Sequence, residues 1–539
     1  MLKKIICDKF IENEIDFYEG LNVILGDDIA SNSIGKTTLL MIIDFVFGGN
    51  DYINKNKDAI ENLGHHAFNY TFKFEDEFLY FSRGTDNPKE ITICDEYFKP
   101  IKENVSLKEY TDLLKQYYKC EINDFSFRDI IGRYFRIYGK ENLNEKKPIQ
   151  YYEKENFSES IINLIKLFNL YPSIKKLEEQ INNIKNEKKF ISDAVKKNFL
   201  PDVTKNIFNA NKDQIDKLNN ELYDLKKSVI SSSISIENIV TQEVIKLKQE
   251  KNNLLSQKNI LISRENRIKK NLDSNKNNVS TEIENFVKYY PSIDIKKLEE
   301  VEYFHNNLVS VLNKEMKASC KEIRARIAVI EENIKQIDKK ILEKLNINDA
   351  PKIAIDRIIE LSNAIKQLEI ENGYYTNLEN LKNSEKHLKE QLTNNKIDIL
   401  SQISNNINEI MTNTNNIIYN NTRRAPVLYL EENRYQFKTE GDTGTGTAYV
   451  SLINFDLAIL TLTCLPALAH DSVLLKNIEN SAFEAIIQLY SESPKQIFIA
   501  LDKLSSYDDT TQKIVNQRKV IQLEKNKTLF VKNWKSNNL

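Results

Sequence analysis

The sequence predicts two globular α/β lobes, one at each end of the chain, separated by a long helical middle. Nine of the 13 glycines lie between Gly20 and Gly139, three lie between Gly441 and Gly446, and only Gly373 lies between these groups. Turns and close backbone approaches use glycine, whereas long helices avoid it, so this distribution indicates loop-rich domains at both ends. Two further observations support the prediction: heptad spacing in the middle and a phosphate-loop pattern near the start.

The middle of the chain has the apolar spacing of a coiled coil. Apolar residues recur at steps of three and four, as in Ile323, Ile327, Ile330, Ile334, Ile337 and Ile341. This pattern is typical of a coiled-coil seam, although an ordinary helical bundle would give a similar one. Prolines and polar runs divide it into an ascending arm (170–281) with an insertion near 199–235, a turn-round region (282–315) and a descending arm (316–412).

A phosphate-binding loop is predicted near the start. An apolar run (Glu19–Gly26) predicts a buried strand, Thr37–Phe47 predicts a helix, and Ala30 replaces the first glycine of G-x-x-x-x-G-K-[ST] between them. Gly26 and the residues after it offer another way to make the turn. Backbone N–H groups would hold the phosphates, with Lys36 on the β- and γ-phosphates. The predicted ATP-binding residues are Asn32, Ser33, Ile34, Gly35, Lys36, Thr37 and Thr38. An ordinary strand-to-helix turn is the alternative.

These features together resemble the SMC/RecN-type ABC ATPases. The resemblance rests on GLNVILG…NSIGKTTLL, the coiled-coil hairpin and a second half-site near the end of the chain. It points to the small bacterial members of defence loci, such as the SMC-like subunit of Lamassu-type systems, and covers the chain in layout but only short motifs in sequence. It implies an α/β ABC-type P-loop ATPase head built from an N-terminal lobe (1–165) and a C-terminal lobe (420–539), with an inserted long antiparallel coiled-coil hairpin.

The resemblance also assigns roles in the C-terminal lobe. A Gly/Thr-rich loop leading into a helix stands where the family has its signature loop, which contacts the nucleotide of the opposite subunit. Its residues are Gly444, Thr445, Gly446 and Thr447. Because the letters differ from L-S-G-G-Q, a plain flexible loop is the alternative. The next apolar run ends in an aspartate, as a Walker B strand does, so Asp471 is expected to hold Mg²⁺ together with Thr37.

Two departures from the family concern hydrolysis. Ser472 stands where the catalytic glutamate normally follows the Walker B aspartate, and the switch histidine is missing from the predicted strand Lys495–Lys503. Another group would have to orient the attacking water, and the residues considered are His470, Glu479 and Asp502, with no preference among them. We therefore expect a slow ATPase or, alternatively, a nucleotide-gated scaffold that does not hydrolyse ATP.

Composition limits the partners and the compartment. The 76 basic and 78 acidic residues give a net charge of −2, so DNA would have to be contacted through a local patch. Five scattered cysteines without a C-x-x-C pair suit the reducing cytoplasm and offer no zinc site. Charges interrupt the N-terminal apolar run, and the longest apolar stretch (Leu457–Ala469) is short and contains Pro466. We therefore expect neither a signal peptide nor a membrane span.

The resemblance implies a homodimer that forms head to head on ATP and Mg²⁺, and whose coils clamp or sense DNA. In a defence complex it would act beside separate effector subunits. A nuclease or toxin activity of the chain itself has no support, because the sequence contains no H-N-H motif and no evident cluster of metal-binding carboxylates. Arg128, Arg133 and Arg136 lie where the family's Q-loop region enters the coil, and both phosphate contacts and structural roles are open for them.

Overall fold

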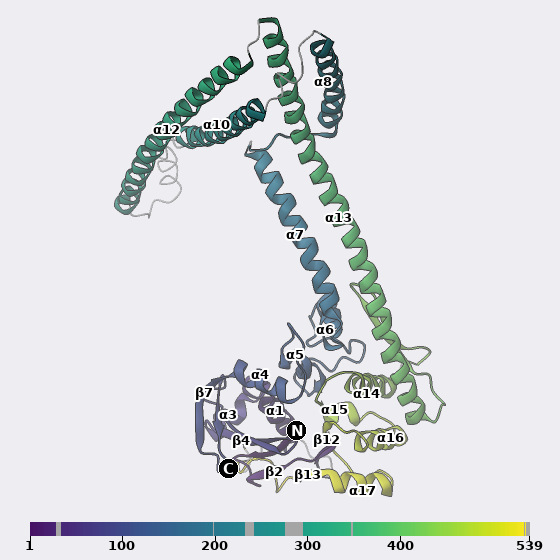
Figure 1. Ribbon diagram of the computed structural model, residues 1–539. Helices are drawn as coiled ribbons and strands as arrows, with labels where there is room; N and C mark the ends of the chain where they lie inside the picture. The colour runs from purple at the N-terminus through teal and green to yellow at the C-terminus, as the bar shows by residue number, and fades with distance from the viewer. Residues whose placement is uncertain are drawn as a thin grey trace. The chain divides into compact units, whose positions relative to one another are not determined.

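The computed structural model contains two compact units. One combines Met1–Phe190 with Leu381–Leu539, and the other is Ile191–Asn380. The first unit joins both ends of the chain into one head (Figure 1), which confirms the predicted fold class. The residues that the structure describes are 1–27, 34–197, 199–231, 242–274, 295–345, 349–442, 444–532 and 534.

A parallel sheet of five strands forms the centre of the head. Its order is β13-β3-β12-β11-β8, and every neighbouring pair in it is parallel. The strands are β3 (Leu21–Leu25), β8 (Phe135–Arg136), β11 (Ala467–His470), β12 (Gln496–Leu501) and β13 (Lys519–Gln522). The N-terminal strand β3 lies between two C-terminal strands, so the sheet needs both ends of the chain. All residues of β3, β11 and β12 are buried, as in parallel strands covered on both faces.

A second, antiparallel sheet is built from N-terminal strands, in the order β2-β1-β4-β5-β6-β7. These strands are β1 (Leu2–Ile6), β2 (Glu14–Asp16), β4 (Ala67–Phe74), β5 (Glu77–Gly84), β6 (Glu90–Cys94) and β7 (Pro100–Ser106). Helix α1 (Lys36–Val46) ends between the two sheets. The ring of Phe47, just after α1, lies 5.4 Å from Phe72 of β4 and 6.2 Å from Phe498 of β12. This position between two sheets explains why the sequence of α1 is almost wholly apolar.

Short helices complete the N-terminal lobe. They are α2 (Asp51–Lys55), α3 (Lys57–Leu63), α4 (Leu107–Tyr117), α5 (Phe127–Ile131), a 3-10 turn (Gly132–Tyr134) and α6 (Phe157–Leu167). Helix α4 packs on the antiparallel sheet through Tyr110, whose ring contacts Tyr70 and Phe81. Both α4 and α5 begin with a capping box, in which the first serine and the third helical residue bond to each other's backbone N–H.

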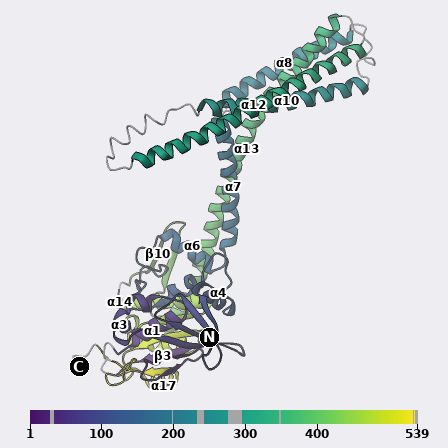
Figure 2. The same ribbon diagram turned by 90° about the vertical axis from the view of Figure 1, so that its left-hand side faces the viewer.

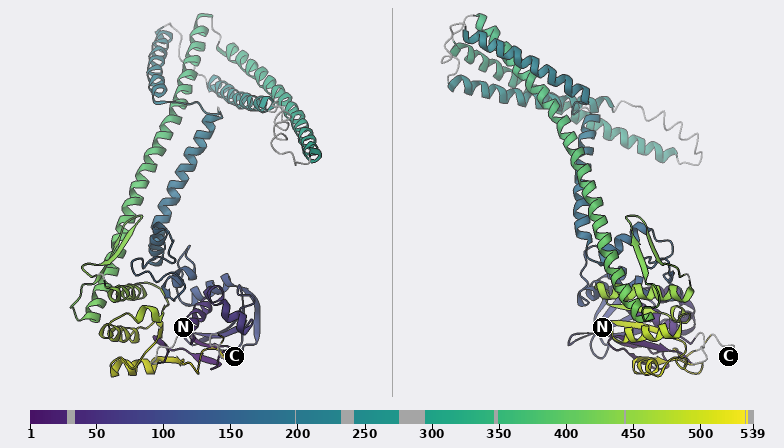
Figure 3. Two further views of the ribbon diagram at one scale, coloured as in Figure 1. Left: turned by 180° about the vertical axis from the view of Figure 1, so that it is seen from behind. Right: turned by 90° about the vertical axis from the view of Figure 1, so that its right-hand side faces the viewer.

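The C-terminal lobe adds a β-hairpin and four helices (Figure 3). The hairpin is β9 (Pro426–Leu430) with β10 (Tyr435–Thr439), and the helices are α14 (Thr445–Leu462), α15 (Ser472–Leu475), α16 (Asn480–Ser491) and α17 (Asp509–Arg518). Among the helices that the structure describes, α14 alone is long and apolar enough to cross a membrane. Since 67% of it is buried inside the protein, it has the surroundings of a core helix.

An antiparallel helix pair leaves the head. Helices α7 (Tyr171–Lys196) and α13 (Asp349–Tyr419) belong to the head over their first and last parts, respectively. Ser173 bonds to Asn395 at 3.3 Å and Lys188 pairs with Glu385 at 2.6 Å, so residue numbers rise on one helix as they fall on the other. This is the pairing that the predicted hairpin requires.

The second unit contains two further antiparallel pairs (Figure 2). Helix α8 (Lys205–Ser231) pairs with α13, where Asn211 bonds to Glu371 and Glu221 pairs with Arg357. Helix α10 (Gln242–Ser274) pairs with α12 (Ile295–Leu345) along an apolar seam that includes Ile337.

These helices subdivide the predicted arms. Helix α8 occupies most of the predicted insertion (199–235), and α12 already covers the second half of the predicted turn-round region (282–315). Residues 275–294, which hold the first part of that region, lie outside the described residues. The described part of the middle therefore consists of several paired helices, and Pro201, a helix-breaking residue, lies between the end of α7 and the start of α8.

Candidate nucleotide-binding site

Three polar side chains lie where three neighbouring strands of the parallel sheet end. Lys36 follows β3, Asp502 follows β12 and Asp471 follows β11, and these strands are adjacent in the sheet. Because the strands are parallel, their carboxyl ends share one edge, which is where open α/β sheets bind ligands. Tertiary structure thus brings the predicted phosphate loop together with the predicted Walker B aspartate.

The phosphate loop enters α1 through a glycine that the backbone requires. Gly35 has φ of 107°, which only glycine adopts without strain, and it caps the start of α1. The C-terminal segment packs directly behind it, because the N–H of Leu529 donates to the carbonyl oxygen of Ile34 at 3.0 Å. Ala30 and the predicted ligands Asn32 and Ser33 lie outside the described residues.

Lys36 points across the sheet edge to the C-terminal lobe. Its Nζ lies 3.0 Å from Oδ1 of Asp502, and its side chain is only 8% exposed. The stem of Lys36 crosses Gly26, where a Cβ would lie 3.2 Å from Cδ of Lys36 and 3.2 Å from the carbonyl oxygen of Leu501. A larger side chain at position 26 would crowd this crossing, which gives Gly26 a structural role that the sequence suggested only in part.

Asp471 is a buried carboxylate beside Thr37. It accepts hydrogen bonds from the backbone N–H of Tyr138 at 3.1 Å and of Ser472 at 2.7 Å, and from the Thr37 hydroxyl. Burial raises the pKa of Asp471 above its ordinary value, despite these hydrogen bonds. A buried carboxylate beside a hydroxyl offers the oxygen ligands that Mg²⁺ prefers, and the cation would relieve the cost of burying the negative charge. Thr37 and Asp471 therefore fit the predicted metal site.

Thr38 faces the other side of the loop. Together with Ile34 and Gly35 it borders a small cavity of about 30 Å³ against the C-terminal segment, where Trp534 donates to Asp58 at 3.1 Å. The described part of the predicted loop, Ile34 to Thr38, is thus held between the sheet edge and this segment.

The signature-like loop forms the start of α14. Gly444 caps the helix, and both Gly444 N–H and the Thr447 hydroxyl donate to the carboxylate of Asp442 at 2.9 Å. Gly446 packs so closely that a Cβ there would lie 2.8 Å from the carbonyl oxygen of Asn477. Thr445 is exposed. These four residues therefore form the capped start of a helix, and their contact with a nucleotide stays a prediction.

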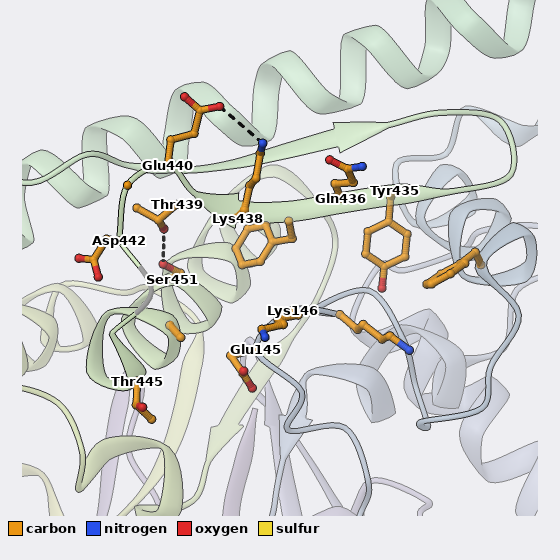
Figure 4. A pocket seen from close by; sticks show the side chains of 15 residues that line it. Glu145, Lys146, Tyr435, Gln436, Lys438, Thr439, Glu440, Asp442, Thr445 and Ser451 are labelled. Atoms are coloured by element: carbon orange, nitrogen blue, oxygen red, sulfur yellow. Dashed lines mark hydrogen bonds and ion pairs between the residues drawn. The ribbon is translucent and has the colours of Figure 1, made fainter.

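A cavity of about 920 Å³ adjoins this loop (Figure 4). It lies between the β9–β10 hairpin, the start of α14 and the segment that contains Lys146. Within it, Thr439 bonds to Ser451 at 3.0 Å and Lys438 pairs with Glu440 at 3.6 Å. This cavity could not be predicted from the sequence, because its walls come from three separate segments.

The three residues considered for water activation have different surroundings. His470 is fully buried: Tyr490 donates to its Nδ1 at 2.6 Å, and its Nε2 donates to Asp456 at 3.1 Å. Both ring nitrogens are engaged inside the core, so His470 could activate water only if these hydrogen bonds broke, and such a role stays a prediction. Glu479 is exposed and pairs with Arg423 at 2.7 Å, near the signature-like loop. Asp502 is the one of the three that contacts the phosphate loop.

The three arginines that follow α4 are structural. Arg128 pairs with Asp44, Arg133 with Glu155 and Arg136 with Asp456, at 2.6–2.7 Å in each case. Arg136 and Asp456 are fully buried. Burial opposes the ionisation of Asp456, but the paired Arg136 guanidinium outweighs it and holds the pKa of Asp456 below its ordinary value. This buried ion pair joins β8 of the N-terminal lobe to α14 of the C-terminal lobe.

Two family models match separate parts of the chain. Residues 8–230 match the family model described as an AAA domain, and residues 404–533 match the model of an uncharacterised protein conserved in bacteria. No curated protein matches the chain. The AAA match contains the phosphate loop and Lys36. The head is therefore an α/β fold with a P-loop-type site, completed by the C-terminal lobe and interrupted by an antiparallel coil.

Two solved structures are similar to the chain over most of its length. The Smc head domain with a coiled coil and joint from Pyrococcus yayanosii is 14% identical, with a TM-score of 0.45, and the match covers 97% of this chain and 94% of that one. The Smc head domain with an extended coiled coil, bound to the C-terminal domain of ScpA, from Pyrococcus furiosus is 12% identical, with a TM-score of 0.35 and coverages of 95% and 91%.

Proposed function

We propose that this protein is an SMC/RecN-like ATPase that binds ATP and Mg²⁺ at the edge of the parallel sheet. One observation carries the proposal: Lys36 and Thr37 from the N-terminal lobe adjoin Asp502 and Asp471 from the C-terminal lobe. An ATP·Mg²⁺ site needs a cation for the phosphates and a carboxylate for the metal. The loop from Asn32 to Thr38 would hold the phosphates, and Thr37 with Asp471 would hold the metal.

Two heads would associate on ATP, each contributing its signature-like loop to the nucleotide of the other. The exposed, small residues at the start of α14 support this, because a helix start presents N–H groups to an anion. Asp442 now accepts hydrogen bonds from this helix start, so a phosphate would have to displace its carboxylate. We expect this displacement to couple nucleotide binding to dimer formation.

The paired helices would clamp or sense DNA. On α10 and α12, a groove of about 390 Å³ is lined by Arg264, Arg267 and Arg326, of which Arg326 pairs with Glu322 of the same groove at 2.6 Å. The two other arginines leave a net positive charge there, and a chain of net charge −2 would need such a local patch. The resemblance of the sequence supports a cytoplasmic sensor subunit of an anti-phage or anti-plasmid complex. Separate effector subunits would then supply the damaging activity.

A second function is favoured by the residue that follows Asp471. Ser472 has no carboxylate, and its hydroxyl bonds back to Asp471 at 3.3 Å. Asp502 could orient water only after releasing Lys36, as it would if phosphates drew Lys36 away. Without such an exchange, the protein would be a nucleotide-gated coiled-coil scaffold that binds ATP, dimerises and does not hydrolyse it.

Binding of a fluorescent ATP analogue with Mg²⁺ tests the proposed site. Lys36→Ala removes the cation that would bond to the phosphates, and charge-assisted hydrogen bonds contribute about 1.5–3 kcal/mol, so affinity should fall about 10- to 100-fold. Lys503→Ala, at the exposed neighbour of Asp502, is the matched control and should bind normally. Equal affinity of the two variants would contradict the proposal.

Phosphate release separates the two functions. ATP-dependent dimers, measured by light scattering after size exclusion, with slow phosphate release that is lost in Asp502→Asn would support the ATPase. The same dimers without phosphate release would support the scaffold. Monomers at saturating ATP and Mg²⁺ would exclude the head-to-head assembly of both.

A further inference from the structure

Two cysteines that the sequence places far apart meet inside the head. Cys120 lies in the segment after α4 of the N-terminal lobe, and Cys464 lies between α14 and β11 of the C-terminal lobe. They are 344 residues apart in sequence, yet the Cys120 thiol donates to the backbone carbonyl oxygen of Cys464, with Sγ 2.8 Å from that oxygen. This contact therefore joins the two lobes through a pair of reduced sulfurs.

The surroundings make the two sulfurs unequal. The proximity of the two thiols lowers the pKa of Cys464 and raises that of Cys120, and burial raises the pKa of Cys120 further. Lys495 lies close by, because its Nζ donates to the carbonyl oxygen of Thr463 at 2.7 Å, and its charge further favours a thiolate at Cys464. Cys464 is partly exposed, whereas Cys120 is only 1% exposed. A partly exposed cysteine with a lowered pKa, here Cys464, next to a buried cysteine with a raised pKa, here Cys120, is the arrangement of a reactive pair.

The other cysteines lack these features. Cys7, Cys94 and Cys320 are all buried. Burial raises the pKa of Cys7 to about 12 and also raises that of Cys94. Neither environment favours a thiolate, so Cys464 is the sulfur that an oxidant would meet first.

We propose that Cys464 and Cys120 form a redox modification site that closes a reversible disulfide between the two lobes. With hydrogen peroxide as oxidant, the Cys464 thiolate attacks one peroxide oxygen, the O–O bond breaks, and hydroxide leaves to take up a proton as water. Cys120 then attacks the resulting sulfenic sulfur, the S–O bond breaks, and a second water leaves with the Cys120 proton. The two thiols lose two electrons in total, and the peroxide gains them.

The disulfide would act on the elements that carry the nucleotide site. Cys464 follows the end of α14, whose start carries the signature-like loop, and precedes β11, which leads to Asp471. The bond would fix this connection against the segment after α4. It would also close a loop across almost the whole inserted coil, and so restrict the unfolded chain. The inference requires only that Cys120 of one lobe contacts Cys464 of the other, and it does not require that the protein bind ATP.

Peptide mapping of the full chain tests the inference. The protein is reduced, freed of reductant and treated with hydrogen peroxide, and its peptides are analysed without reduction by mass spectrometry. We expect a linked pair of peptides that contain Cys120 and Cys464, a loss of two thiols per chain, and full reversal by dithiothreitol. Cys464→Ser should abolish the linked pair, whereas the control Cys94→Ser should leave it unchanged.

Thermal unfolding gives a second, independent measurement. Oxidised wild-type protein should unfold at a temperature several degrees higher than the reduced form, and Cys464→Ser should show no such shift. Because Cys464 is partly exposed, this variant tests the pair even if Cys120→Ser fails to fold. Oxidation of Cys464 to sulfinic acid without a linked peptide, or a link to a cysteine of a second chain, would overturn the proposal.

Discussion

Replacing Gly35 with alanine tests how the C-terminal segment supports the phosphate loop. Gly35 has φ of 107°, and a Cβ there would lie 2.4 Å from Cβ of Leu529. Forcing a non-glycine residue into left-handed backbone costs about 1–2 kcal/mol. Crowding a packed site costs a further ~1–3 kcal/mol. We therefore expect Gly35→Ala to lower the free energy of unfolding by about 2–5 kcal/mol, a large share of the ~5–15 kcal/mol of a typical domain.

A double-mutant cycle separates the two contributions. Leu529 is 1% exposed. Leu529→Gly removes Cβ together with the rest of the side chain and leaves a cavity, so it should alone cost about 2.5–6 kcal/mol. In the double variant, the new methyl group at position 35 occupies space that the leucine has left, which removes the crowding but not the backbone strain. The double variant should therefore lose about 1–3 kcal/mol less than the sum of the single losses.

Urea titration followed by tryptophan fluorescence measures these losses. The chain has a single tryptophan, Trp534, whose ring lies 6.0 Å from Phe530 in the same segment. Val531→Ala is the control, because Val531 is 60% exposed and should change stability by less than ~0.5 kcal/mol. Additive losses in the double variant, within about 0.5 kcal/mol, would refute the reasoning, because they would mean that Leu529 does not restrict position 35.

Two further predictions concern buried charges. Arg136→Met removes the guanidinium that pairs with the buried carboxylate of Asp456 and leaves that carboxylate only its contact with His470, so it should cost about 3–5 kcal/mol in urea titration. Part of this loss should be recovered when Asp456→Leu is added, and no recovery would contradict the pairing. Burial raises the pKa of Asp471, so the folded, metal-free protein binds this proton more tightly than the unfolded chain, and stability falls as pH rises through the raised pKa. The Asp471→Asn variant should therefore unfold at a temperature a few degrees higher than wild type at neutral pH. It should also lose Mg²⁺-dependent ATP binding. An unchanged unfolding temperature would argue against a destabilising buried charge at Asp471.

The sequence predicted those parts of the site that depend on local spacing. Gly35, Lys36 and Thr37 follow a buried strand and start an apolar helix, and short-range backbone geometry is enough to place them. Asp471 could be found because it ends an apolar run. The signature-like loop was located by resemblance, and the structure adds the Asp442 cap, which lies only a few residues away but which no spacing rule requires.

Other parts of the site could not be predicted. A histidine beside an aspartate looks the same in sequence whether it faces solvent or the core, and only the structure shows that His470 is buried and bonded to Tyr490 and Asp456. The pairing of Lys36 with Asp502 and the meeting of Cys120 with Cys464 were equally hidden. Each joins residues that are hundreds of positions apart.

By itself, the sequence determined the helical middle, the strand and helix around the phosphate loop, and the type of residue at each point of the site. These features are periodic or local, so hydrophobic spacing and glycine placement record them. The resemblance already implied that both lobes form one head, but only the tertiary structure decided that β3 lies between β12 and β13, with Leu21 opposite Ile497. The reason is physical: pairing between distant parallel strands depends on backbone hydrogen bonds, which any sequence of buried apolar residues can make.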